Sequence, residues 1–153
     1  MLKLAMLVNL VFFATVVSQP LFYAIALGHA SRALSAPAYI ELRNAINAVM
    51  KRRVPVVYLG ALTACLSVLV LSALDGDPWM AMTSAVALAA LIADAALMVR
   101  ENVPINGVIE TWTPMQYPAD WETYRTRWMA IFAVRRVLLV IGFVSLLIGA
   151  VFR

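Results

Sequence analysis

Four apolar runs constrain this chain most, because each is long enough to cross a membrane. They cover about residues 4–27, 54–74, 79–99 and 132–152. Runs of ~17–25 apolar residues span the hydrocarbon of a bilayer as α-helices. Only 13% of all residues are charged, against about a quarter in water-soluble domains. The sequence therefore predicts an all-α membrane protein, a bundle of four transmembrane helices in a single domain over residues 1–153.

The first run has a second interpretation as a signal peptide, since Lys3 precedes it and Ser35 and Ala36 follow it as small residues. A signal peptide, however, has an apolar region of only ~7–15 residues. We therefore expect a retained helix.

Basic residues near the helix ends predict the orientation. Ten of them lie in or beside the first and third connections: Arg32, Arg43, Lys51, Arg52, Arg53, Arg100, Arg125, Arg127, Arg135 and Arg136. Because basic connections stay in the cytoplasm, we expect both termini outside, the long connections inside, and the protein in the inner (cytoplasmic) membrane. The same asymmetry accounts for the net charge of +4. It favours the lipid bilayer as a partner and not nucleic acid.

Metal and thiol chemistry lack their usual ligands in this sequence. Cys65 is the only cysteine, which excludes an internal disulfide and a thiolate metal site. His29 is the only histidine and has no Cys or carboxylate cluster at ligand spacing. No nucleophile signature accompanies it either. The sequence thus predicts no metal, no cofactor and no His-based triad.

The first apolar run carries a polar stripe. Thr15, Ser18 and Gln19 share one helix face at i, i+3 and i+4, and Pro20 is expected to kink the helix after them. The stripe favours hydrogen bonding between helices. The alternative is that Gln19 lines a pocket.

The second and fourth helices are expected to extend beyond the membrane on the cytoplasmic side. Ser35 or Ala36 can cap a helix with Pro37 in its first turn. Four apolar residues and one arginine then recur at helical spacing (Tyr39, Leu42, Ile46, Val49 and Arg53), with Arg43, Asn44, Asn47 and Lys51 elsewhere. This amphipathic pattern could lie flat on the headgroups, but we favour one rod running to residue 74. The fourth helix could start at Asp120 and exceed thirty residues. The third connection could fold against both and roof a cavity.

Asp94 is the one ionisable residue within the third apolar run. Such residues are functional candidates and need a partner. Arg135 and Arg136 enter the fourth helix to a similar depth, which predicts an ion pair of Asp94 with one of them. A structural pair that locks the two helices is the favoured interpretation. Gly142, Ser145 and Gly149 form a small-residue stripe for close helix packing.

The polar interval 100–131 introduces an ordered set of motif residues. It begins with N-x-P-x-N (Asn102, Pro104, Asn106) and continues with Trp112, Trp121, Arg125, Trp128 and Arg135. This set resembles the anthrone oxygenase-like family of small four-helix membrane proteins. The resemblance covers nearly the whole chain in helix count and loop order, and its specific part is confined to residues 102–136.

Members of that family with an assigned activity oxidise anthrones, which are tricyclic polyketides, to anthraquinones with dioxygen and without metal or flavin. The resemblance therefore implies a cytoplasmic-face pocket for a planar phenolic or quinone-like lipophile. Such chemistry needs a base for an acidic C–H and preorganised donors for the oxyanion. Arg125 or Arg135 would be the oxyanion donor. Asp94 or Glu101 would be the base.

Substrate binding would fall to residues of the same motif. Asn102 and Asn106 would bind the substrate carbonyl or phenol. Trp121 and Trp128 share a helix face with Arg125 and would flank the flat substrate, with Trp112 beside them. Gln19, from the polar stripe of the first run and outside this motif, would also line the pocket.

Each of these groups also has a structural interpretation. The three tryptophans could form an interfacial belt, Asn102 and Asn106 could be cap and turn residues where the third helix stops at Pro104, and Arg125 could be a positive-inside anchor. The rival function is a non-enzymatic membrane subunit whose Trp/Arg face docks a partner protein and stays open and flat. A transporter is disfavoured, since repeated broken helices are missing. The sequence leaves open a homo-oligomer or a partner membrane protein.

Overall fold

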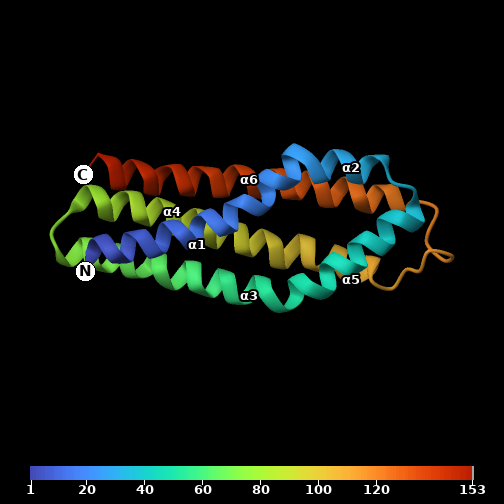
Figure 1. The fold of residues 1–153 in the computed structure, drawn as a ribbon, viewed down its shortest axis with the longest axis horizontal. Helices are drawn as coiled ribbons and strands as arrows, with labels where there is room; N and C mark the ends of the chain where they lie inside the picture. Colours follow the sequence, from blue (N-terminus) through green and yellow to red (C-terminus); the bar gives the residue numbers. More distant parts are fainter. Residues whose placement is uncertain (153) are drawn as a thin grey trace.

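Helices are the only regular elements in the computed structural model, which describes residues 1–152 (Figure 1). Their bounds are α1 Leu2–Phe22, η1 Tyr23–Leu27, α2 Gly28–Ala33, α3 Ala36–Leu74, α4 Pro78–Leu97, η2 Met98–Asn102, α5 Val103–Ile109 and α6 Trp121–Val151. The segments η1 and η2 are single π-helical turns. They join their neighbours into continuous helices, so the chain forms four long helices.

The four long helices are Leu2–Ala33, Ala36–Leu74, Pro78–Ile109 and Trp121–Val151, and each is long and apolar enough to cross a membrane. Both termini lie at one end of the bundle, which we call the terminal end, and α2 and α5 lie at the other, which we call the polar end (Figure 1). The predicted all-α bundle of four membrane-crossing helices is confirmed.

The helices pack in a ring in which α6 contacts α4 and α1, and α3 contacts α1 and α4. In Figure 1, α1 runs obliquely, from beside α3 at the terminal end toward α6 at the polar end. The small-residue stripe of α6 allows the close approach. A Cβ added to Gly142 would lie 2.6 Å from Phe13 of α1 and 3.1 Å from Ala90 of α4. Ser145 donates a hydrogen bond to the backbone carbonyl of Thr83 at 2.9 Å.

Large apolar side chains cover the outside of the bundle. Val56, Leu59 and Ile25 are 69%, 67% and 78% exposed, and exposed apolar surface on this scale is expected where helices face lipid. The core is therefore narrow, and the few polar groups inside it are conspicuous.

The long rods are found where the sequence predicts them. α3 has 39 residues, begins after the N-cap Ser35 with Pro37 in its first turn, and passes through Pro55. α6 has 31 residues and follows the N-cap Asp120. The buried face of the α3 extension, however, does not coincide with the stripe seen in the sequence. Arg43 and Asn47 are buried, whereas Val49 is 49% exposed, because α5 packs on the polar side of this rod.

The third helix does not stop near residue 99, and this corrects the interpretation of Asn102 and Asn106 as cap and turn residues. Pro104 has no N–H for the carbonyl four residues earlier. The turn before it widens into η2, where the Val103 N–H bonds to the Met98 carbonyl. The helix then continues to Ile109. As a result, Asn102 and Asn106 lie on one helix face, one turn apart.

The tight turn at the terminal end has the expected geometry. Gly76 adopts φ +69°, a left-handed conformation that glycine reaches without steric cost. Asp77 caps α4 by accepting a hydrogen bond from the Met80 N–H at 2.9 Å. This turn places α3 and α4 side by side.

Enlarging Gly142 tests the close packing of α6. We expect Gly142→Val to lower the free energy of unfolding by about 1–3 kcal/mol, the usual cost of overpacking a core, because the new side chain meets Phe13 and Ala90. Gly107→Ala is the matched control, since a Cβ there meets nothing within 4 Å. Thermal unfolding in detergent, followed by circular dichroism, measures both. An unchanged midpoint for Gly142→Val would contradict the packing.

Candidate functional site

An aromatic cluster fills the polar end of the bundle. Its buried members come from η1, α3, α5, α6 and the connection between α5 and α6: Tyr23, Tyr39, Ile40, Ile105, Ile109, Trp112, Trp128 and Phe132. A separate apolar core occupies the rest of the bundle toward the terminal end. The candidate site lies where buried polar groups meet the aromatic cluster.

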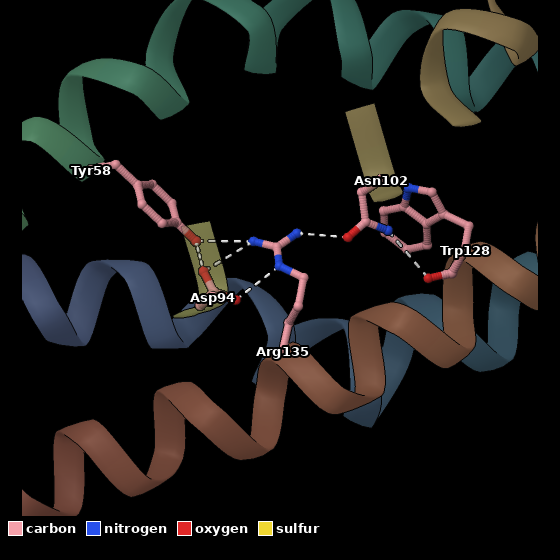
Figure 2. Close-up of polar contacts among 5 residues, drawn as sticks. All are labelled: Tyr58, Asp94, Asn102, Trp128 and Arg135. Carbon is pink, nitrogen blue, oxygen red and sulfur yellow. Dashed lines mark hydrogen bonds and ion pairs between the residues drawn. The ribbon is translucent and has the colours of Figure 1, made fainter. Parts of the chain in front are cut away.

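A buried polar network joins α3, α4, η2 and α6 (Figure 2). Arg135 donates from Nε to Asp94 at 2.8 Å, from one terminal nitrogen to Asn102 at 3.1 Å, and from the other to Tyr58 at 3.0 Å. Tyr58 in turn donates its phenol proton to Asp94. Asn102 donates to the backbone carbonyl of Trp128 at 3.4 Å. The network therefore runs from Asp94 to the edge of the aromatic cluster.

The Asp94–Arg135 ion pair is the predicted one, and Arg136 is not its partner. Asp94 is 0% and Arg135 3% exposed. A charge in such surroundings is costly unless it is paired and its remaining hydrogen-bonding groups are satisfied. Arg135 neutralises Asp94, and Tyr58 and Asn102 occupy the remaining donors and acceptors. The predicted ion pair between the third and fourth helices is present.

The N-x-P-x-N motif holds two buried arginines. Asn102 accepts from Arg135 at 3.1 Å, and Asn106, one turn further on, accepts from Arg43 of α3 at 2.5 Å. Because η2 and α5 are continuous through Pro104, the two amides point into the bundle at successive levels. In this structure both amide oxygens are used to position arginines. Direct contact of either amide with a substrate stays a prediction.

Arg43 differs from Arg135 in having no carboxylate partner. Arg43 is 5% exposed. It takes part in none of the ion pairs found among residues 1–152. Its guanidinium lies 4.1 Å from the centre of the Trp128 ring. Trp128 stacks on Phe132 at 4.6 Å, and Phe132 lies 5.2 Å from the Arg135 guanidinium. The two arginines therefore bracket a column of stacked aromatic rings.

Four buried polar atoms on residues in or beside the Arg43 end of this column have no hydrogen-bond partner. They are Nε of Arg43, Nε1 of Trp128 and the phenol oxygens of Tyr23 and Tyr39. Tyr39 lies one turn before Arg43 on α3, and the Tyr23 ring lies 5.1 Å from the Trp128 ring. Buried polar groups are nearly always satisfied in folded proteins. This donor cluster, as we call it, therefore suits a ligand oxygen that bears negative charge.

Arg125 lies at the outer edge of the aromatic cluster. It stacks on Trp121 at 4.5 Å and donates to the carbonyls of Ser31, Arg32 and Leu34, at 3.2, 3.4 and 3.5 Å. These carbonyls lie at the C-terminal end of α2, so Arg125 links the first long helix to α6. The cation beside Trp128 is Arg43, from a different helix. The oxyanion role assigned to Arg125 stays a prediction.

The tryptophans point into the bundle. Trp112 is 7% and Trp128 5% exposed, and Trp112 packs edge-on against Tyr124 at 5.2 Å. A belt at the membrane interface needs its rings in contact with headgroups. The belt interpretation is therefore wrong for these two residues, and Trp121, which packs against Tyr39, closes the same cluster from outside.

Gln19 lines a groove of about 260 Å³ between α1 and α3. The groove is bounded by Val16 and Gln19 on one side and by Val54, Val57 and Tyr58 on the other. Gln19 contacts the Met50 sulfur at 3.8 Å. Tyr58 connects the two features, because its ring borders the groove and its hydroxyl belongs to the buried polar network.

Comparisons with protein-family models, with curated proteins and with solved structures gave no match. Residues 1–152 also contain no group of three or more His, Cys, Asp or Glu side chains that could hold a metal ion. The resemblance to the anthrone oxygenase-like family thus rests on the motif residues, and the chemistry must be argued from their geometry.

Four important residues of the site escaped the sequence analysis, namely Tyr23, Tyr39, Arg43 and Tyr58. Arg43 had been placed on the polar side of an amphipathic helix, and the three tyrosines carry no local signature. One signal was present in the sequence. Arg43 and Asn47 are four residues apart, and their polar partners Asn106 and Glu110 have the same spacing. The structure pairs Arg43 with Asn106 and Asn47 with Glu110.

Removing one charge of the buried pair tests the network. We expect Asp94→Asn to lower the free energy of unfolding by about 3–5 kcal/mol, because it leaves the buried Arg135 charge uncompensated. The double variant Asp94→Asn/Arg135→Gln should recover part of that loss, since both charges are then absent. Asp75→Asn, at an exposed turn, is the control. Thermal unfolding of the detergent-solubilised protein measures the stability of each variant. An equal loss of unfolding free energy in the single and the double variant would contradict the pairing.

Proposed function

We propose that this protein is a membrane oxygenase of the anthrone oxygenase-like kind, which oxidises a planar phenolic or quinone-like lipophile with dioxygen and without a cofactor. The observation that carries the proposal is the donor cluster beside the Arg43–Trp128–Phe132–Arg135 column. A buried arginine with no carboxylate partner calls for a ligand with negative charge, and a column of flat rings suits a flat ligand.

The donor cluster supplies what the reaction needs most. When a proton leaves the carbon next to a carbonyl, negative charge develops on the carbonyl oxygen. Fixed donors in a dry site stabilise that charge at little reorganisation cost, and removing one such donor typically slows the chemical step by about 10²–10³-fold. We assign Arg43, Tyr23 and Trp128 as these donors. Asn106 acts as a positioning residue by holding Arg43.

The proposed reaction converts a methylene group and dioxygen into a carbonyl group and water. The methylene carbon loses a proton to the Asp94–Tyr58 pair and becomes an enolate. The enolate gives one electron to dioxygen, and the carbon radical and superoxide join through a new C–O bond. The resulting peroxide takes up a proton. Its O–O bond then breaks with loss of the second C–H proton, which leaves a carbonyl on the former methylene and releases one water.

Asp94 is the better placed of the two candidate bases. It is buried and shares a hydrogen bond with Tyr58, which borders the groove between α1 and α3. Glu101 instead pairs with Arg127 on the outside of the helix at 2.8 Å. The groove gives a lipophilic substrate a lateral approach from the bilayer to Tyr58.

The inward packing of the Trp/Arg face supports the enzyme over the docking subunit. A docking surface needs an open, flat face, but Trp112 and Trp128 are buried and the Arg125 side chain is only 11% exposed. We further propose the inner membrane as the location, with the termini outside and the polar end in the cytoplasm, because the basic residues gather at the polar end.

An oxidation assay in lipid nanodiscs tests the function. With anthrone as the substrate, wild-type protein should consume dioxygen and form anthraquinone in a one-to-one ratio, faster than empty nanodiscs. Arg43→Gln should lower kcat by about 10²–10³-fold, since it removes the charged donor. Arg52→Gln removes an exposed arginine from the same helix and should retain the wild-type rate.

The thermal midpoint of each variant shows whether a lost rate reflects unfolding. Wild-type turnover no faster than empty nanodiscs, with anthrone and with hydroxylated anthrones, would overturn the oxygenase proposal. An Arg43→Gln rate equal to that of Arg52→Gln would remove Arg43 from the mechanism.

A further inference from the structure

A second polar pocket lies on the outside of the bundle at the polar end, between the first long helix and α6. Its volume is about 310 Å³. Two arginines and the only histidine line it, namely Arg32, Arg136 and His29, over a floor that includes Tyr23 and Phe132. The pocket thus combines an apolar floor with a rim of positive charge.

Neither arginine of this rim is neutralised by the protein. Within residues 1–152, the guanidinium groups of Arg32 and Arg136 have no hydrogen bond or ion pair. The contrast with Arg135 is direct, because this neighbour of Arg136 points inward and is neutralised by Asp94. Of two consecutive arginines, one has its anion inside the protein and the other has none.

The depth of Arg136 indicates where its anion comes from. Arg136 is one helical turn inside the apolar run that begins at Phe132, which is ~6 Å at 1.5 Å per residue. Long basic side chains at this depth extend toward the headgroups. Ile25 and Val137, which follow the lining residues Ala24 and Arg136 in sequence, are 78% and 55% exposed, so both helices offer apolar surface for acyl chains.

We propose that the pocket is a binding site for an anionic phospholipid, with the headgroup phosphate held between Arg32 and Arg136 and the acyl chains along Ile25 and Val137. Arginine suits this ligand because its planar donor fork matches the phosphate oxygens. His29 adds a further hydrogen-bonding group at the rim. The lipid site does not depend on the proposed oxidation.

Native mass spectrometry of the detergent-purified protein tests this site. With equimolar phosphatidylglycerol and phosphatidylcholine added, wild-type protein should retain phosphatidylglycerol in preference. Each arginine near the surface contributes about fivefold to the binding of an anionic lipid. We expect Arg136→Gln to lower the preference by about that factor and Arg32→Gln/Arg136→Gln to abolish it. Arg136→Lys, which retains the charge, should keep part of it.

The matched control is Arg52→Gln, which removes one exposed arginine of α3 away from this pocket and should leave the preference unchanged. Equal retention of the two lipids by wild-type protein, or a preference in the double variant equal to that of Arg52→Gln, would overturn the site. Inorganic phosphate at millimolar concentration should leave the lipid adduct in place. Displacement of the lipid by phosphate would show a free-anion site and overturn the assignment to lipid.

Discussion

The Asp94–Arg135 ion pair is the interaction on which the arrangement of this bundle depends. A carboxylate at this depth in an apolar bundle needs a cation, and the cation needs further acceptors. Arg135 meets Asp94 across the α4–α6 contact, while Tyr58 from α3 and Asn102 from η2 satisfy what remains. One pair thus fixes the relative position of three long helices at the level where apolar packing gives way to the aromatic cluster.

Three arginines of this protein differ in where their counterion is found or expected. Arg135 finds its anion inside the protein. Arg136 faces outward into a pocket at the lipid boundary, where we propose a phospholipid headgroup as its counterion. Arg43 is buried against Trp128 with an amide as its acceptor, and we propose a substrate oxyanion as its counterion. Each arginine needs a counterion, and the observed or proposed source of that counterion distinguishes the structural role of Arg135 from the roles that we propose for Arg136 and Arg43.

The two π-helical turns lie beside the proposed site. η1 begins with Tyr23 and η2 ends with Asn102. A π-helical turn adds a residue to a helix and so rotates the side chains that follow, and such turns are frequent at functional sites. Here η2 accommodates Pro104 without ending the helix. As a result, Asn102 and Asn106 each accept a hydrogen bond from a different arginine. A straight α-helix that stopped at residue 99 would have left both amides in a loop.

The sequence alone predicted several features of this protein. They are the four membrane-crossing helices, the long rods that end at residue 74 and begin after Asp120, and the pairing of Asp94 with an arginine of the fourth helix. These features depend on local periodicity, on the length of apolar runs and on the cost of a buried charge, which neighbouring residues suffice to reveal. Only the tertiary structure showed three further features. They are the choice of Arg135 over Arg136 as the partner of Asp94, the inward face of α3, and the meeting of Arg43 with Tyr23, Tyr39 and Trp128. Residues from three separate long helices form that meeting point, and their contacts depend on how each helix is rotated about its own axis. Packing between helices determines that rotation. Lipid solvates an apolar helix face as well as the protein interior does, so the apolar pattern of one helix does not show which face points inward.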